Sequence, residues 1–104
     1  MNDYHKEIEK IISKKPIILF MKGSKLMPLC GFSSSVVDIL KTYSITFETM
    51  DVLQDNDLRT HLKTYTNWPT FPQLYVQGEF VGGCDIIMQL HSEGELKKIL
   101  EKEQ

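Results

Sequence analysis

The spacing of hydrophobic residues changes several times along this chain, and each change indicates a new element. Over residues 4–12 the apolar positions recur at the spacing of one helix face, and Pro16 ends that pattern. A short, continuous apolar run follows at residues 17–21. Its β-branched start predicts a strand buried on both faces, as in a parallel or mixed sheet. Residues 22–29 are rich in turn-forming residues and predict a loop.

The middle of the chain continues with helix-like and strand-like patterns in alternation. Residues 31–43 carry apolar side chains at helical spacing, and residues 45–52 read as a second strand. A further helix is expected over the apolar positions 58–65, with either Asp55 or Asn56 as its N-cap. The sequence therefore predicts two strands connected through a helix, which requires the strands to pair in parallel.

The last third of the chain predicts a hairpin followed by two helices. Gln77-Gly78 separates two short strand-like runs and has the composition of a tight turn. Residues 92–95 have the form of a capping box ahead of the last helix. The expected elements are strands at 73–76 and 79–81 and helices over 86–90 and 96–100. One mixed four-stranded sheet with helices on both faces, an α/β fold, accommodates this order.

Length and charge narrow the classes of protein that fit. A chain of 104 residues corresponds to one domain, residues 1–104, and its 41% apolar content is that of a globular protein. The net charge of −2 provides no basic field for nucleic acid or an anionic membrane, so neither is expected as a partner. No apolar run approaches the ~20 residues that span a bilayer.

The cysteines and the N-terminal segment indicate a reducing compartment. Cys30 and Cys84 are the only cysteines, which is not a disulfide framework for a small secreted domain. The first residues are acidic and contain no apolar core, which is atypical of a secretory signal or a mitochondrial presequence. The expected location is the cytoplasm.

Cys30 is the main candidate for chemistry. It follows a strand and a loop and begins a helix, where free backbone N–H groups favour thiolate over thiol. Lys22, at the end of that strand, adds positive charge. The third residue after Cys30 is Ser33, in the place where a Cys-x-x-Cys motif has its resolving thiol. Cys30 must therefore complete its chemistry with the thiol of another molecule, act as a thiolate ligand, or be an inert small hydrophobic residue.

Three stretches in order, MKGS…PLCGFSSSVV, NWPTFPQLYV and VGGCDI, resemble the monothiol glutaredoxins of the Cys-Gly-Phe-Ser class. The similarity extends over essentially the whole chain, in order and in spacing. It implies a thioredoxin-like fold, which agrees with the element order above. The active-site loop departs from the common pattern of the family, because Lys25 stands where a proline is frequent and Leu29 where a polar residue is frequent.

The resemblance implies a glutathione site beside Cys30. Lys22 and the guanidinium of Arg59 are implied to pair the glycyl carboxylate, and Arg59 is the only arginine in the sequence. The backbone before a cis proline, Pro72, pairs the cysteinyl unit. A helix start receives the γ-glutamyl group, with a carboxylate near its ammonium. The implied residues are Lys22, Arg59, Phe71, Cys84 and Asp85.

Each of these residues also has a simpler interpretation. Arg59 is then an exposed surface cation, Phe71 a core residue and Asp85 a first-turn acid. Cys84 is expected to serve as a small residue and not as a second catalytic thiol. Trp68 and Pro69 are expected to serve in packing and in a turn.

Three functions follow from the resemblance and the lone active-site thiol. The first, which the resemblance favours, is an iron–sulfur carrier in which Cys30 of each of two subunits and two glutathione thiols hold a [2Fe–2S] cluster. Its expected partners are a second copy when cluster is bound, apo iron–sulfur client proteins and a BolA-like protein. The second is a glutathione-dependent thiol-disulfide oxidoreductase, and members of this class are generally poor reductants. The third is a non-redox interaction module.

Nothing in the sequence indicates a large apolar interface, and the three histidines have no ligand spacing with either cysteine for zinc.

Overall fold

The computed structural model describes residues 3–101, which contain one mixed four-stranded sheet of order β2-β1-β3-β4. β1 pairs in parallel with β2 and antiparallel with β3, and β3 pairs antiparallel with β4. The expected parallel crossover and the expected hairpin are both confirmed. The strands are β1 (Ile17–Met21), β2 (Glu48–Asp51), β3 (Gln73–Val76) and β4 (Glu79–Gly82).

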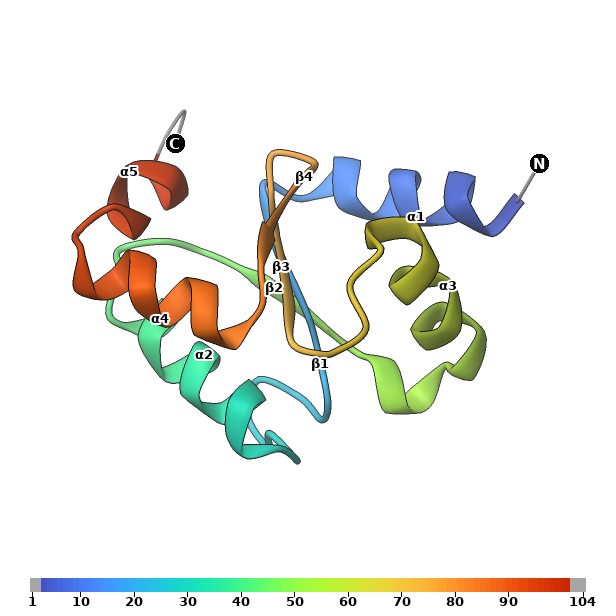
Figure 1. The fold of residues 1–104 in the computed structure, drawn as a ribbon, viewed down its shortest axis with the longest axis horizontal. Helices are drawn as coiled ribbons and strands as arrows, with labels where there is room; N and C mark the ends of the chain where they lie inside the picture. The colour runs from blue at the N-terminus through green and yellow to red at the C-terminus, as the bar shows by residue number, and fades with distance from the viewer. Residues whose placement is uncertain (1–2, 102–104) are drawn as a thin grey trace.

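Helices cover both faces of this sheet, as the sequence predicts. Figure 1 views the sheet nearly edge-on, with α2 and α4 on one side and α1 and α3 on the other. The helices are α1 (Asp3–Lys14), α2 (Gly31–Lys41), α3 (Asn56–Thr66), α4 (Cys84–Ser92) and α5 (Leu96–Leu100), with a 3-10 turn η1 (Val52–Gln54) between β2 and α3.

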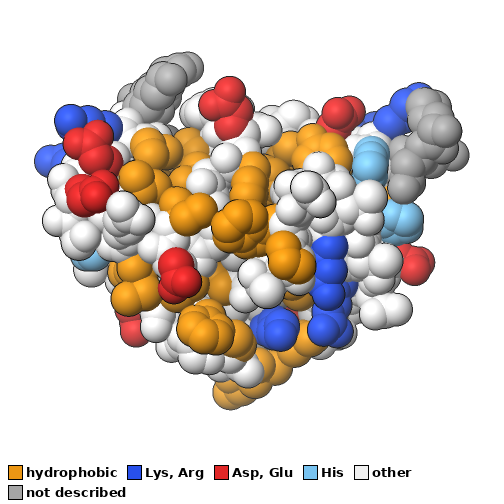
Figure 2. Space-filling model, viewed as in Figure 1, with side chains coloured by type: hydrophobic (Ala, Val, Ile, Leu, Met, Phe, Trp, Pro, Cys, Tyr) orange, Lys and Arg blue, Asp and Glu red, His pale blue; other side chains and the backbone are white. Residues whose placement is uncertain are grey.

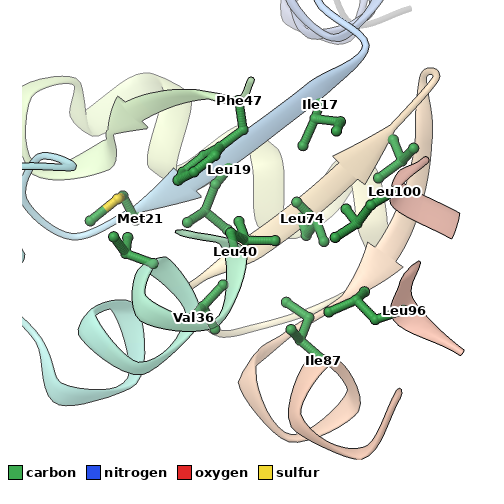
Figure 3. Close-up of a cluster of buried hydrophobic side chains, with 12 residues drawn as sticks. Ile17, Leu19, Met21, Val36, Leu40, Phe47, Leu74, Ile87, Leu96 and Leu100 are labelled. Atoms are coloured by element: carbon green, nitrogen blue, oxygen red, sulfur yellow. The ribbon is translucent and has the colours of Figure 1, made fainter. Parts of the chain in front are cut away.

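Alternation along the central strands produces two hydrophobic cores. All five residues of β1 are buried, which confirms the strand buried on both faces. Leu19 and Leu74 face α2 and α4 in the core shown in Figure 3. Phe20 and Tyr75 face α1 and α3, and their rings meet edge-to-face with centroids 5.4 Å apart. The sheet is therefore held rigidly from both sides, and the loops at its ends are attached to a fixed frame.

The second strand is shorter than the sequence predicts. Residues 45–47 have no regular structure, and only Glu48–Asp51 pair with β1. The Asp51 carboxylate ends the strand, because its Oδ1 accepts from the backbone N–H of Leu53 at 2.9 Å and starts η1. The same oxygen accepts from the N–H of Gly23 at 2.9 Å, which ties β2 to the loop after β1.

Two helix boundaries also differ from expectation. The capping box at residues 92–95 is wrong: Ser92 ends α4 and its hydroxyl donates to the Gln89 carbonyl, so it does not cap α5. α2 ends at Lys41, two residues early, where the backbone N–H of the next residue closes the last turn. For α3 the open alternative resolves to Asp55, whose side chain accepts from Leu58 N–H.

Candidate functional site

The loop between β1 and α2 sets the position of Cys30. The loop closes on itself where the N–H of Leu29 donates to the Lys22 carbonyl at 2.9 Å. This closure requires glycine at position 23, which has φ +91° and where an added Cβ would lie 2.5 Å from the backbone nitrogen of Leu29. Cys30 then takes an extended conformation as the N-cap residue of α2, so the expected placement of this thiol at a helix start is confirmed.

The two residues that depart from the family pattern have clear structural roles in this loop. The Lys25 ammonium donates to the Phe47 carbonyl and lies 4.3 Å from the centre of the Phe47 ring. Lys25 therefore anchors the loop to the segment that leads into β2. Leu29 projects outward together with three neighbouring side chains. We call this group the apolar patch; its members are Leu26, Met27, Leu29 and Phe32, each at least 60% exposed.

The apolar patch is not predictable from the pattern of the sequence. Loop residues 24–29 show no period that would indicate a buried or an exposed face. In the structure the patch borders Cys30 on both sides in the chain. An exposed apolar group of this kind beside a reactive thiol indicates a surface for contact with another molecule.

The Cys30 thiol is more acidic than an ordinary cysteine. Its pKa is lowered chiefly because the backbone N–H of Ser33 donates to the sulfur. Partial burial opposes this effect. The backbone of Phe32, the Ser33 hydroxyl and the charge of Lys22 lower the pKa of Cys30 further. Ser33 is fully buried and its Oγ accepts from the Lys22 N–H at 3.2 Å, so its hydroxyl is fixed beside the sulfur. Ser33 therefore stabilises the thiolate from the position of a resolving cysteine.

Replacing Ser33 by alanine is expected to raise the pKa of Cys30, because the thiolate loses one hydrogen-bond donor. The rate of alkylation by iodoacetamide as a function of pH measures this shift, in a Cys84→Ser background so that one thiol reports. Ser35→Ala, an exposed serine on the same helix, is the matched control. An unchanged or lowered midpoint for Ser33→Ala would exclude a role for the hydroxyl.

Cys84 has the opposite character. It is the first residue of α4, and burial raises the pKa of its thiol. The neighbouring charges of Asp85 and Cys30 raise the pKa of Cys84 further. Its sulfur lies 3.6 Å from that of Met88. The two cysteines are both free, but their pKa values are shifted in opposite directions, which makes Cys30 the more acidic of the two thiols.

A groove of about 350 Å³ brings the candidate residues together. Its lining comes from the Cys30 end of α2, the loop before β3 and the start of α4, elements that can be followed in Figure 1. Every residue proposed from the sequence lines it: Lys22, Cys30, Arg59, Phe71, Cys84 and Asp85. These six residues come from five parts of the chain: the end of β1, the start of α2, α3, the loop before β3 and the start of α4.

The groove also contains residues that sequence reasoning missed. Trp68 and Pro69, expected in packing and in a turn, line it together with Thr70. Lys63 lies one turn after Arg59 on α3, so the i, i+4 spacing was a signal that both cations share one helix face. Phe32 belongs at once to the groove and to the apolar patch.

The groove carries positive charge on a protein of net charge −2. Its lining includes three cations, Lys22, Arg59 and Lys63, and one carboxylate, that of Asp85. Figure 2 shows basic side chains beside hydrophobic ones on the lower part of this face. The Arg59 Nε is buried and has no hydrogen-bond partner among the residues that the structure describes. An unpaired buried donor of this kind is costly, and an anionic ligand in the groove would satisfy it.

Phe71 lies both in the core and at the groove. Its ring is 6% exposed and packs in the core beneath α3, while the residue also lines the groove. The Phe71–Pro72 peptide bond is cis, as predicted. The core-packing interpretation and the backbone-binding interpretation are therefore compatible.

Two further observations bear on other kinds of site. Within residues 3–101, no group of three or more His, Cys, Asp and Glu side chains is arranged to hold a metal ion. In the same part of the chain, the helices are too short or too polar to cross a membrane.

Comparison with protein families and curated proteins shows what this chain is similar to. The family model described as Glutaredoxin matches residues 17–81. An uncharacterized monothiol glutaredoxin, ycf64-like, of Synechocystis is 53% identical over 94 residues, covering 90% of this chain and 88% of that protein. Monothiol glutaredoxin-S11 of rice is 48% identical over 98 residues, covering 94% of this chain. The chain spans only 20% of the rice protein's length.

Solved structures confirm the thioredoxin-like fold. The solution structure of reduced poplar apo GrxS14 superposes with a TM-score of 0.83 at 46% identity, covering 95% of this chain and 91% of that chain. The crystal structure of a buckwheat glutaredoxin–glutathione complex superposes with a TM-score of 0.80 at 23% identity, covering 96% of this chain and 93% of that chain. The buckwheat similarity concerns the fold alone.

Proposed function

This chain belongs to the glutaredoxin family, in its monothiol class, and on that premise we propose that it binds glutathione beside Cys30 and carries a [2Fe–2S] cluster for iron–sulfur assembly and transfer. The observation that carries the proposal is the groove, which combines a lone acidic thiol with a positive wall. Ser33 beside that thiol leaves Cys30 without a resolving thiol within this motif. We propose that glutathione supplies the second sulfur.

Glutathione matches the groove in charge and in the order of its groups. Its two carboxylates, one ammonium and one thiol give it a net negative charge. Lys22 and Arg59, with Lys63 beside them, suit the glycyl carboxylate. The Phe71 backbone suits the cysteinyl unit, which places the glutathione thiol at the Cys30 end. The start of α4 has free N–H groups for the second carboxylate, and its acidic residue there suits the ammonium.

The cluster is the cargo of the proposed carrier, and its ligand requirement determines the assembly. A [2Fe–2S] cluster takes four ligands, usually thiolates. Cys30 supplies one; burial raises the pKa of Cys84, which makes it the poorer thiolate ligand of the two. A second copy of the chain supplies another, and two glutathione thiols complete the set. Half of the ligands are then small molecules that exchange, which suits delivery to apo client proteins.

The surface around Cys30 supports contact with a second subunit. The apolar patch borders the thiol and is exposed, so a partner that approaches Cys30 covers it. We propose a homodimer when cluster is bound, with a BolA-like protein as an alternative partner. We also propose a cytoplasmic location, because both free thiols require a reducing compartment.

The lowered pKa of Cys30 also supports a second candidate, a glutathione-dependent oxidoreductase. In that reaction the Cys30 thiolate attacks the glutathione sulfur of a mixed disulfide and the client thiolate leaves. The thiol of a second glutathione then attacks the Cys30–glutathione disulfide, which releases oxidised glutathione and restores Cys30. This chemistry needs no second subunit. The two candidates therefore predict different species: the carrier binds a cluster as a dimer, whereas the oxidoreductase works as a monomer without a cluster.

Replacing Arg59 by lysine is expected to weaken glutathione binding by about 1 kcal/mol, or about fivefold in affinity. The charge remains, but the planar pair of donors that matches a carboxylate is lost. Isothermal titration calorimetry measures the change. Arg59→Ala, which removes the charge as well, should weaken binding more. Equal affinities in wild type and both variants would make Arg59 a surface cation only.

A further inference from the structure

The loop before β3 forms one wall of the groove without belonging to a helix or strand. We call residues 68–70 the rim segment; Trp68, Pro69 and Thr70 all line the groove. Its first residue is held by its own backbone, since the N–H of Trp68 donates to the Lys63 carbonyl and to the Thr66 hydroxyl, each at 3.2 Å. Pro69 has no N–H to donate. The backbone carbonyls of the rim segment therefore need a hydrogen-bond donor from elsewhere.

That partner is Gln73, a fully buried polar side chain at the start of β3. Its Nε2 donates to the carbonyls of Trp68 at 3.2 Å and Thr70 at 3.3 Å. A primary amide has two N–H donors, so both are engaged with the rim segment. The two carbonyls set the orientation of the amide, and its Oε1 is satisfied because it accepts from the Tyr75 hydroxyl at 3.3 Å. One buried amide therefore connects the rim segment to the sheet.

The rim segment in turn contacts the other wall of the groove. Trp68 packs so closely on Gly83 that an added Cβ there would lie 2.9 Å from the indole nitrogen. Gly83 is the N-cap residue of α4, whose first residues line the groove. A displacement of Trp68 would therefore change the packing at Gly83 and at the start of α4.

We propose that Gln73 is a positioning residue that holds the rim segment in the geometry that binds glutathione. The inference rests on the proposed function for its ligand, but the hydrogen bonds that carry it do not. Gln73 itself is fully buried and does not line the groove, so it acts through Trp68 and Thr70. Without the Gln73 donors, the carbonyls of Trp68 and Thr70 lose their hydrogen bonds. The rim segment is then expected to shift toward solvent, where water can donate to them.

Gln73→Glu tests this with almost no change in size. An ionised carboxylate offers only acceptors to the two carbonyls, whereas the protonated acid regains one donor, and burial favours the protonated form at mildly acidic pH. Glutathione affinity by calorimetry is expected to fall about tenfold at pH 8 and to recover in part at pH 5.5, relative to wild type at each pH. Gln77→Glu, the same change in an exposed hairpin turn, is the control and should follow wild type.

A second measurement needs no ligand. Trp68 is the only tryptophan in the sequence, so its fluorescence reports the rim segment directly. Acrylamide should quench it more strongly in Gln73→Glu and in the uncharged Gln73→Met than in wild type. Tyr75→Phe removes the hydroxyl behind Gln73 but leaves both donors, so it should lower the melting temperature with little change in quenching.

The two measurements separate the possible failures. If wild type does not bind glutathione, the proposed function fails, and the quenching still decides the role of Gln73. Wild-type quenching and affinity in both Gln73 variants would overturn the inference. If Gln73→Glu does not fold, Gln73→Met alone decides. Quenching that rises equally in Tyr75→Phe would assign the effect to general loosening of the core, and would also overturn it.

Discussion

Replacing Cys30 by serine abolishes [2Fe–2S] reconstitution, whereas Cys84→Ser retains most of it: this is the expected result of largest effect. A serine hydroxyl does not ionise near neutral pH, so the variant supplies no anionic ligand at the end of the groove. Cys84 contributes less, because burial raises the pKa of its thiol. Reconstitution with iron, sulfide and glutathione in the absence of oxygen, followed by visible absorbance, compares the two variants.

The Cys84→Ser variant is the matched control for this experiment, since both cysteines line the same groove and the substitution is the same. Far-ultraviolet circular dichroism and glutathione affinity check that each variant keeps the fold and the groove. Equal loss of cluster in both variants would remove Cys30 as the distinctive ligand. Retention of cluster by Cys30→Ser would point to a different site.

The second large effect concerns glutathione. If two of the four cluster ligands are glutathione thiols, removing free glutathione depletes the bound state by mass action and the cluster is lost. The visible absorbance of wild-type protein should decay after gel filtration into glutathione-free buffer and persist in buffer that contains it. Glutathione whose thiol is blocked by methylation is the control, because it fits the groove but supplies no ligand. Protection by the blocked form would contradict ligation by glutathione.

Loss of cluster should also return the protein to monomers. The apolar patch comprises four side chains, Leu26, Met27, Leu29 and Phe32. A stable interface of standard size uses roughly 20–30 residues on each side. The patch therefore contributes to contact between subunits that the cluster joins, and it is too small to hold them together alone.

The order of elements was predictable from the sequence because hydrophobic period and turn residues act locally. β1 was recognisable as a continuous apolar run, and the hairpin by its Gln77-Gly78 turn. The length of β2 was not, because its start depends on which residues pair with β1: pairing begins at Glu48, opposite Ile18, and residues 45–47 stay outside the sheet. The expected capping box failed for a local reason, since the Ser92 hydroxyl donates back into α4.

The candidate site was predictable in its principal residues for a different reason, namely the three motifs shared with a known family. The motifs left out Lys63, which belongs to the groove because of its place on α3. Thr70 lies inside the second motif, but its place in the groove depends on Gln73, which donates to its carbonyl. Most of the apolar patch comes from the loop before Cys30, and contacts distant in sequence hold that loop, among them the anchoring of Lys25 on Phe47.

One measurement tests the central claim most directly: size-exclusion chromatography of the cluster-loaded protein without oxygen, with light scattering, visible absorbance and assays of iron and glutathione on the same peak. The account predicts that the visible colour elutes at about 24 kDa, twice the chain mass of 12.1 kDa, with two glutathiones and two irons per two chains. After chelation of the iron, the protein should elute colourless as a monomer. A cluster that elutes on a single chain, or on a dimer without glutathione, would contradict the account.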